Sequence, residues 1–408
     1  RSLLIVLLPA LLAACARAPA STPPVPTQTL SSPLVVAWVD GGSLFRWQDG
    51  EVMTLAEGGV VQPILSPDGE WVAFTRGAQG RAETLWVASR DGADVREAVS
   101  RDQLQPFRGG EPCVNQVVWL DNRTLLFNTA QAYDWGTLPQ NDLYRVSLDT
   151  GTVDLLLPRD EGGAISVSPN RQHVALVFPG TLGAVEGRVT LFNPTTLAAR
   201  ELLRFESATP PDTPPYYPNI FWATDSQSLR LAIPEWDADF LPGQADVRTS
   251  LWRVSVNDGE PPRVTGIVLA DVDGLPRWSA NGAHTAFLKR GERSADPFNL
   301  IVADANAAER RVVASGARTT LTPPQWLPDE SRLTYIEDGV RRLALPDGEA
   351  QTLPGVLVAF PGGGYYVLTT SLAPPNELRF ARLDDPADST LIAVLQTAVP
   401  AFDAVIAR

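Results

Sequence analysis

Apolar residues fall in short runs along most of the chain. From residue 34 onward, runs rich in Val, Leu, Phe and Trp alternate apolar with polar positions and stop at Gly, Pro, Asn or Asp. No stretch longer than two helical turns keeps its apolar residues at helical spacing. This pattern predicts an all-β fold from residue 34 to the end of the chain.

The predicted strands recur in register. In each unit, two apolar residues nine positions apart enclose a polar turn, as at Leu65/Phe74, Val167/Leu176, Trp222/Leu231, Trp278/Phe287 and Trp326/Tyr335. Trp119/Phe127 has the same form, one residue shorter. In a turn such as Ser66-Pro67-Asp68-Gly69, Pro presets φ, Asp bonds to its own backbone and Gly accepts a positive φ, so each unit begins with a hairpin.

A second hairpin follows in each unit, as in Leu85-Trp86-Val87 followed by Asp91-Gly92. Two linked hairpins make a four-stranded sheet, and such sheets bury their faces by packing radially against their neighbours as the blades of a β-propeller. The recurring tryptophans Trp86, Trp252, Trp278 and Trp326 are then predicted to be core residues.

Blade number follows from the repeats. Seven units begin near residues 61, 117, 165, 219, 275, 324 and 356. Residues 34–39, 43–47 and 51–55 supply only three strands, and residues 399–406 offer the fourth. The sequence therefore favours eight blades, with the ring closed by a C-terminal strand that joins the N-terminal blade. Seven blades is the alternative, because the last unit, with Phe360-Pro361-Gly362-Gly363-Gly364, departs furthest from the pattern.

The stretch from Ile64 to Phe74, with its strand–SerProAspGly–strand core, resembles the TolB-type propeller repeat, which is related to tryptophan-aspartate repeats. The resemblance covers most of residues 34–406, with one unit near the consensus and the others degraded. It implies a propeller domain over residues 34–408.

The N-terminal segment has the features of a secretion signal. Arg1-Ser2 precedes an apolar run over residues 3–12, which is too short for a bilayer core that needs about 20 residues. The run ends in Leu12-Ala13-Ala14-Cys15, which resembles the lipobox of bacterial lipoproteins and implies cleavage before Cys15 and a lipid on its thiol. A simple signal peptide with a chance Cys is the alternative.

The lipoprotein interpretation divides the chain into a signal peptide over residues 1–14, a lipidated Cys with a Pro/Ser/Thr-rich tether over residues 15–33, and the propeller over residues 34–408. It predicts a protein held at a membrane outside the cytoplasm, at the cell surface or in the periplasm. With 47 Asp and Glu against 33 Lys and Arg, the net charge of −14 disfavours a nucleic-acid partner. The remaining thiol, Cys113, is predicted to be a partly buried apolar residue.

Catalytic motifs are missing from the sequence. It contains no Gly-x-Ser-x-Gly elbow, His-Glu-x-x-His pair, phosphate-binding loop or cysteine zinc spacing, so we predict no enzyme activity, cofactor or metal. His173 and His284 stand at equivalent repeat positions, which indicates a shared structural role. The pairs Asp237/Asp239 and Asp271/Asp273 could bind Ca²⁺ or act as acid and base, although solvated loop charges explain them more simply.

Propeller geometry places the longer connections on one face. Insertions over residues 128–142, 206–218 and 234–250 carry aromatic side chains beside Asp, a composition suited to protein or glycan binding. The candidate binding residues are Tyr133, Asp134, Trp135, Tyr216, Tyr217, Trp236, Asp237, Asp239 and Phe240. The alternative is that these aromatics fold inward and cap the blades.

Three functions remain open from the sequence. The first is a non-catalytic module that binds or scaffolds a protein or glycan. The second is a metal-assisted hydrolase or lyase that acts on sugars or lactones at the central channel, which would need carboxylates and a His at the axis. The third is an accessory sensor for a transporter or peptidase.

Overall fold

The computed structural model describes residues 33–407 apart from residues 78–80, 135, 182, 208, 210–214, 237–245, 292–295, 329–331, 346–349 and 398–399. The chain divides into two compact units, residues 1–32 and 33–408, and the fold below is that of the second. The predicted signal peptide, Cys15 and nearly all of the tether lie outside the described residues.

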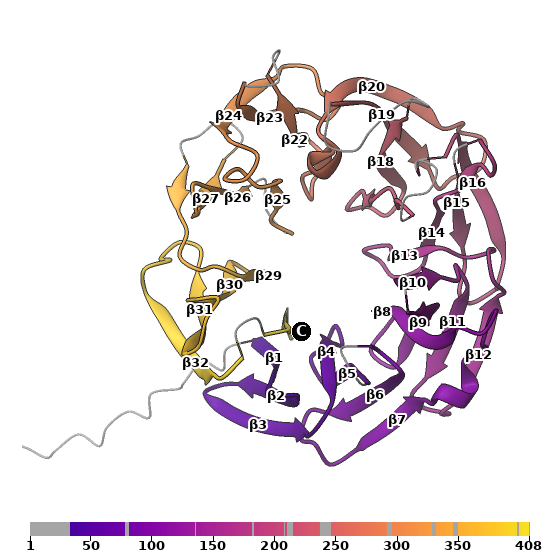
Figure 1. The fold of residues 1–408 in the computed structure, drawn as a ribbon, viewed down its shortest axis with the longest axis vertical. Helices are drawn as coiled ribbons and strands as arrows, with labels where there is room; N and C mark the ends of the chain where they lie inside the picture. Colours follow the sequence, from indigo (N-terminus) through magenta and orange to yellow (C-terminus); the bar gives the residue numbers. More distant parts are fainter. Residues whose placement is uncertain are drawn as a thin grey trace, which may run out of the picture. The chain divides into compact units, whose positions relative to one another are not determined.

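Eight antiparallel sheets follow one another around a ring as the blades of a β-propeller (Figure 1). The first blade runs β33-β1-β2-β3, with bounds Phe402–Ile406, Leu34–Asp40, Ser43–Gln48 and Glu51–Ala56. Strand β33 pairs with β1 in the register Val35↔Val405. The predictions of eight blades and of a C-terminal strand that closes the ring are therefore confirmed.

The remaining blades each use consecutive strands. Blades two to four are β4 (Val60–Leu65), β5 (Trp71–Arg76), β6 (Thr84–Ser89), β7 (Val95–Val99); β8 (Glu111–Trp119), β9 (Thr124–Tyr133), β10 (Gly136–Pro139), β11 (Leu143–Ser147), β12 (Val153–Leu157); and β13 (Ala164–Val167), β14 (Val174–Phe178), β15 (Gly187–Phe192), β16 (Ala199–Phe205). Blades five and six are β17 (Ile220–Trp222), β18 (Ser228–Glu235), β19 (Val247–Ser255), β20 (Arg263–Ala270); and β21 (Arg277–Trp278), β22 (His284–Arg290), β23 (Phe298–Asp304), β24 (Arg311–Gly316). Blades seven and eight are β25 (Gln325–Trp326), β26 (Leu333–Glu337), β27 (Val340–Ala344), β28 (Gln351–Thr352); and β29 (Val358–Gly362), β30 (Tyr365–Thr369), β31 (Asn376–Arg382), β32 (Ser389–Leu395).

Blade three departs from the prediction, which treated residues 128–142 as a loop. Strand β9 continues to Tyr133 and turns into β10, which pairs back on it with Tyr133 opposite Gly136. On its other edge β9 pairs with β8 from Leu125 to Ala132. Because ladders on both sides satisfy the β9 backbone, the hairpin extends past the blade as strand.

Indole side chains join the inner strands of neighbouring blades. The Nε1 atoms of three tryptophans donate to the innermost strand of the preceding blade: Trp119 to the Ile64 carbonyl (3.0 Å), Trp222 to Ser166 Oγ (3.1 Å) and Trp326 to the Arg277 carbonyl (2.8 Å). A buried Trp needs a partner for its N–H, and this arrangement supplies one while fixing the blade spacing.

The four tryptophans predicted to be core divide into two pairs. Trp278 and Trp326 are buried, as predicted. The prediction was wrong for Trp86 and Trp252, which are only half-buried. Both stand on the third strand of their blades, β6 and β19, where the sheet approaches the outer rim of the ring.

The predicted turns close with one repeated set of hydrogen bonds. Ser66, Ser168 and Ser279 each donate Oγ to the carboxylate or amide oxygen two residues on, at 2.6–2.8 Å. Each Oγ also accepts from the backbone N–H five residues on. In two blades that N–H belongs to His173 and His284, which confirms their equivalent structural positions.

Candidate functional site

The two faces of the propeller carry different connections. One face, the turn face, holds the turns between the first and second and the third and fourth strands of each blade. The opposite face, the long-loop face, holds the connections between second and third strands and between blades. Its longest segments are residues 206–219, before β17, residues 236–246, between β18 and β19, and residues 100–110, before β8. The longest of these connections joins blades four and five.

Three of the predicted aromatic residues tie loops together. The Tyr133 hydroxyl donates to the Phe107 carbonyl (3.0 Å), and the Tyr217 hydroxyl donates to Asn141 Oδ1 (2.7 Å) across 76 positions of sequence. Tyr216 packs between the cores of blades four to six. Burial raises the pKa of both Tyr216 and Tyr217 to about 12. These tyrosines help to order the long-loop face.

The other predicted residues are placed differently. Asp134 is exposed at the tip of the β9–β10 hairpin, and Trp236 is half-buried at the end of β18. Trp135, Asp237, Asp239 and Phe240 lie outside the described residues.

Asp271 and Asp273 both form ion pairs within the fold. Asp271 is buried and accepts a hydrogen bond from the Asp273 N–H in a short 3₁₀ turn over Val272–Gly274. Arg318 forms ion pairs with both carboxylates. The pair therefore caps a turn and anchors an arginine.

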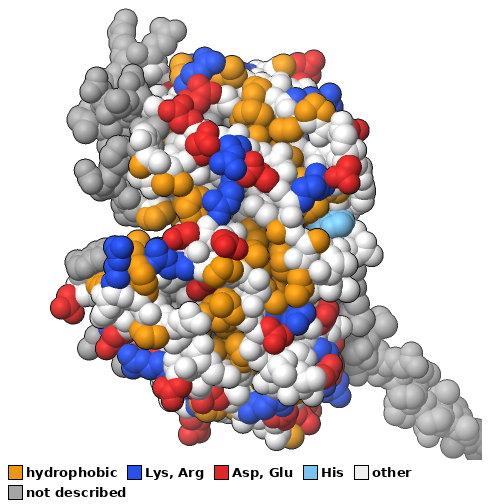
Figure 2. All heavy atoms as spheres, turned by 90° about the vertical axis from the view of Figure 1, so that its right-hand side faces the viewer, with side chains coloured by type: hydrophobic (Ala, Val, Ile, Leu, Met, Phe, Trp, Pro, Cys, Tyr) orange, Lys and Arg blue, Asp and Glu red, His pale blue; other side chains and the backbone are white. Residues whose placement is uncertain are grey.

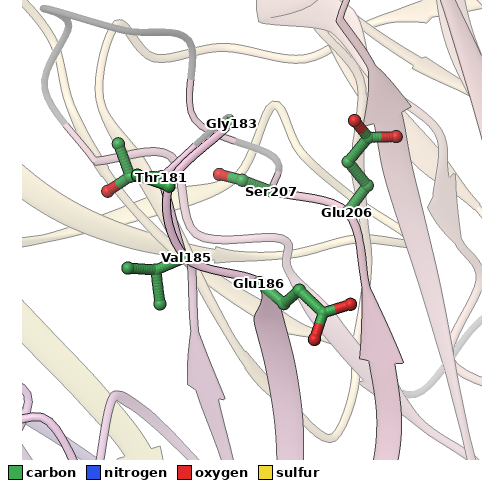
Figure 3. Close-up of a pocket in the computed structure, with 7 residues that line it drawn as sticks. Thr181, Gly183, Val185, Glu186, Glu206 and Ser207 are labelled. Carbon is green, nitrogen blue, oxygen red and sulfur yellow. The ribbon is translucent and has the colours of Figure 1, made fainter.

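Two adjoining cavities open between blades four and five, and together they form the blade 4–5 cleft. The first, of about 450 Å³, is lined by Thr181, Gly183, Ala184, Val185, Glu186, Glu206 and Ser207 (Figure 3). The second, of about 320 Å³, is lined by Arg204, Phe205, Glu206, Ser207, Ile233, Pro234, Glu235, Trp236, Ser250 and Trp252. Glu206 and Ser207 line both, so the two hollows adjoin at these residues.

Charge in the cleft is mostly acidic. Glu186 pairs with Arg204 (3.1 Å) and Glu235 pairs with Arg248 (2.7 Å). Hydrogen bonds to Glu201 and then Glu186 raise the pKa of the Arg204 guanidinium. Glu206 is exposed and forms no hydrogen bond or ion pair with any residue that the structure describes. Its carboxylate is available to a ligand.

The hydroxyl of Ser207 is used within the fold. Its Oγ donates to the Pro179 carbonyl (3.2 Å) and accepts from the Thr209 N–H (2.9 Å). In Figure 3 this hydroxyl points toward the Thr181–Gly183 loop, away from the Glu206 carboxylate. Ser207 therefore shapes the cleft floor.

Apolar side chains continue outward from the cleft onto the rim of blade five. Val264, Ile267 and Leu269 of β20 are 42–49% exposed and lie on the same face of the sheet as Trp252. On the side of the ring where β12 and β16 lie, Figure 2 also shows apolar side chains among charged ones. A contiguous apolar patch of this kind marks many interaction surfaces.

Within the described part of the chain, no three His, Cys, Asp or Glu side chains come close enough together to hold a metal ion. No helix in that part is both long and apolar enough to cross a membrane. Cys113 is buried beside Ala130 and Ala132, and burial raises the pKa of its thiol. The buried apolar role predicted for Cys113 matches its position.

Comparison with known proteins gives the fold and no more. No family model matches the chain, and no curated protein matches its sequence. A crystal structure of the eukaryotic initiation factor is similar, with a TM-score of 0.51 and 9% identity over 91% of this chain and 98% of that one. A structure of prolyl endopeptidases has a TM-score of 0.50 and 13% identity over 85% of this chain and 50% of that one. TolB from Acinetobacter baumannii aligns at a TM-score of 0.33 and 12% identity over 69% of this chain and 64% of that one. The first two agree with the topology described above: the domain is a β-propeller.

Proposed function

We propose that this chain is a lipid-anchored, extracytoplasmic propeller that binds a protein or glycan without catalysing a reaction. The anchor rests on the resemblance of Leu12-Ala13-Ala14-Cys15 to a lipobox and on the Pro-rich tether that follows it. The TolB-type repeat around Ser66-Pro67-Asp68-Gly69 suits such a module. The binding surface is the long-loop face.

The observation that carries the proposal is the blade 4–5 cleft. Its walls are aromatic, formed by Phe205, Trp236 and Trp252, and Glu206 supplies a carboxylate with no partner among the described residues. Aromatic faces beside carboxylates bind the basic side chains of a protein through cation–π and ionic contacts, or stack on sugar rings. Ser207 is held by backbone groups, which favours binding over nucleophilic chemistry.

Co-purification from host membranes tests the cleft. We expect a partner to be recovered with the native chain and with Trp71→Ala, a control at a half-buried Trp that follows the Ser66 turn on the opposite face. The double variant Trp236→Ala/Glu206→Ala should lose it, since aromatic anchors commonly cost about 2–4 kcal/mol when truncated. A partner retained by the double variant would contradict the assignment to this cleft. If no protein is found, the same variants are compared on immobilised glycans.

The anchor has its own test. Cys15→Ser should move the protein from the membrane fraction to the released fraction, because the thiol that would carry the lipid is gone. Membrane association that survives this change would contradict lipid anchoring and leave the propeller assignment untouched.

A further inference from the structure

A separate cavity of about 270 Å³ lies on the long-loop face of blade three, and we call it the blade 3 cavity. Its lining comes from the connection after β7, the segment before β11, β11 itself, and β12 with the connection that follows it. The lining residues are Gln105, Pro106, Phe107, Gln140, Asp142, Tyr144, Leu155, Pro158 and Arg159. None of them lines the blade 4–5 cleft.

Gln140 lines this cavity, and its side chain carries a buried acceptor that the fold leaves unused. The residue is 4% exposed, and its Nε2 donates to the Leu138 carbonyl at 3.0 Å, which fixes the orientation of the amide. Its Oε1 is buried and accepts no hydrogen bond within the described residues. A buried acceptor without a donor is costly, so a donor from a ligand would stabilise it.

Asp142 adds a second acceptor and a negative charge. It is 5% exposed and accepts from the Thr129 N–H (2.7 Å) and from Thr129 Oγ1 (2.5 Å). No ion pair links it to a cation among the described residues. Burial, partly offset by the Thr129 bonds, raises the pKa of this carboxyl. A buried carboxylate is stabilised by a cationic donor, and an ammonium group is a compact one.

The cavity also holds donors for an anion. The Arg159 guanidinium lies 3.6 Å from the Phe107 ring centroid and pairs with Asp160 at 3.0 Å, which leaves further N–H donors. The Tyr144 ring stacks on Phe127 at 4.9 Å, while its hydroxyl forms no hydrogen bond within the described part of the chain. A ligand carboxylate matches this pair of donors.

We propose that the blade 3 cavity binds a free α-amino acid. The ammonium group is received by Asp142, beside Gln140, the carboxylate by Arg159 and Tyr144, and the side chain by Pro106, Leu155 and Pro158. A small molecule with both charges on one carbon satisfies acceptors and donors together. This site is independent of the partner proposed for the blade 4–5 cleft.

Calorimetric titration of the full chain tests the ligand class. The ligands are glycine, L-leucine and L-phenylalanine, with L-leucinamide and N-acetyl-L-leucine as matched compounds that lack the carboxylate or the ammonium charge. We expect at least one amino acid to bind and each blocked compound to bind at least about tenfold more weakly than leucine, since each loses a charge-assisted contact. No binding by any of the three amino acids at millimolar concentration, or equal binding by the blocked compounds, would overturn the proposal.

Two variants test the site. Tyr144→Phe removes a hydroxyl that has no hydrogen bond in the described structure, and Asp142→Asn removes the charge. We expect about tenfold weaker binding for Tyr144→Phe and a larger loss for Asp142→Asn. The matched control Tyr366→Phe, at a buried tyrosine of blade eight that donates to the Pro386 carbonyl, should bind as the native chain does. If Asp142→Asn fails to fold, Tyr144→Phe decides alone, and unchanged binding would overturn the proposal.

Discussion

Repeated local hydrogen bonds mark the turn face of this propeller, whereas bonds between residues remote in sequence order the long-loop face. On the turn face, Ser66, Ser168 and Ser279 make the same contacts within six residues of chain in three different blades. On the long-loop face, side chains reach other blades, as when Tyr217 donates to Asn141. The serine contacts of the turn face thus close each hairpin locally, and further bonds on the same face join these turns to neighbouring blades, as when Arg171 Nη1 donates to the Trp119 carbonyl at 2.9 Å.

The short turns belong to the rigid scaffold, and the connections of the long-loop face form the candidate binding surface. Because the turns are local and repeated, their sequences are constrained and their lengths are short. The connections of the opposite face vary in length and composition, and both candidate cavities lie among them. Rigid repeats that carry variable loops are a common way to build binding sites.

The largest loss of stability is expected when Asn128 is replaced, because its side chain links blades three and four. Asn128 is 3% exposed; its Oδ1 accepts from the Gln116 N–H (2.9 Å) and Asn115 Nδ2 (3.1 Å), and its Nδ2 donates to the Gly163 carbonyl (2.8 Å). Asn128→Leu leaves the half-buried Gln116 N–H and the buried Gly163 carbonyl unpaired, while the exposed Asn115 amide turns to water, so we expect a loss of about 2–4 kcal/mol in the free energy of unfolding. Denaturant unfolding measures it. A loss below about 1 kcal/mol would show that this hub does not hold blades three and four together.

Removing the serine hydroxyl of a local turn should lower the free energy of unfolding by less than Asn128→Leu does. The loss should be the same in each of the three turns. Ser66→Ala, Ser168→Ala and Ser279→Ala remove one donor and one acceptor in equivalent turns, so we expect about 1–2 kcal/mol for each. Pairs of these substitutions should add, because the sites share no partners. Unequal or non-additive losses in the same unfolding measurement would break the distinction between local and between-blade bonds.

Strand β33, which closes the ring, should make a smaller contribution to stability, and this contribution should depend on pH. Asp403 of β33 accepts from the Leu65 N–H of blade two at 2.8 Å, and burial raises the pKa of its carboxyl. Between the ordinary pKa and the raised one, the folded state binds more protons than the unfolded state. The native chain should therefore lose stability relative to Asp403→Asn as pH rises above about 4.

Thermal unfolding from pH 4 to 7 tests this sign. Ser279→Ala serves as the control, since its turn bonds involve the Asn281 amide and the His284 N–H and no carboxylate, and it should follow the native curve in parallel. A stability of the native chain relative to Asp403→Asn that rises or stays constant with increasing pH would contradict the role given to this carboxyl.

The smallest effect is expected at an exposed charge. Arg204 pairs with Glu186 and Glu201 at the mouth of the blade 4–5 cleft, and all three side chains are at least 38% exposed. Arg204→Gln should change the free energy of unfolding by less than about 1 kcal/mol, because water screens such pairs. It should strengthen binding of a basic partner by making the cleft more acidic. Weaker binding would indicate that Arg204 itself contacts the ligand.

Much of the architecture could be predicted because it repeats. The spacing of Leu65 and Phe74 recurs in other blades, and the three strands predicted at residues 34–39, 43–47 and 51–55 needed a fourth, which residues 399–406 could supply. The β10 strand was missed because Gly136 and Pro139 resemble loop residues, and its pairing depends on how far β9 continues.

The candidate sites were harder to predict. Tyr133 and Tyr217 were selected as exposed aromatics, yet their hydroxyls bond to Phe107 and Asn141, which are remote in sequence. Glu206, which lacks a partner among the described residues, has no local pattern that distinguishes it from other glutamates. Which side chains remain unpaired depends on tertiary contacts, and a single sequence does not display these.

The most direct test of a binding long-loop face is site-specific photo-crosslinking in living host cells. A photoreactive residue is placed at Glu186 or Glu206 in the cleft, and at Asp91 or Asp258 on the turn face, all of them exposed positions. We expect a discrete crosslinked partner or glycan from the two cleft positions and none from the turn-face positions. Crosslinks from the turn face alone, or none from either cleft position, would contradict the assignment of function to the long-loop face.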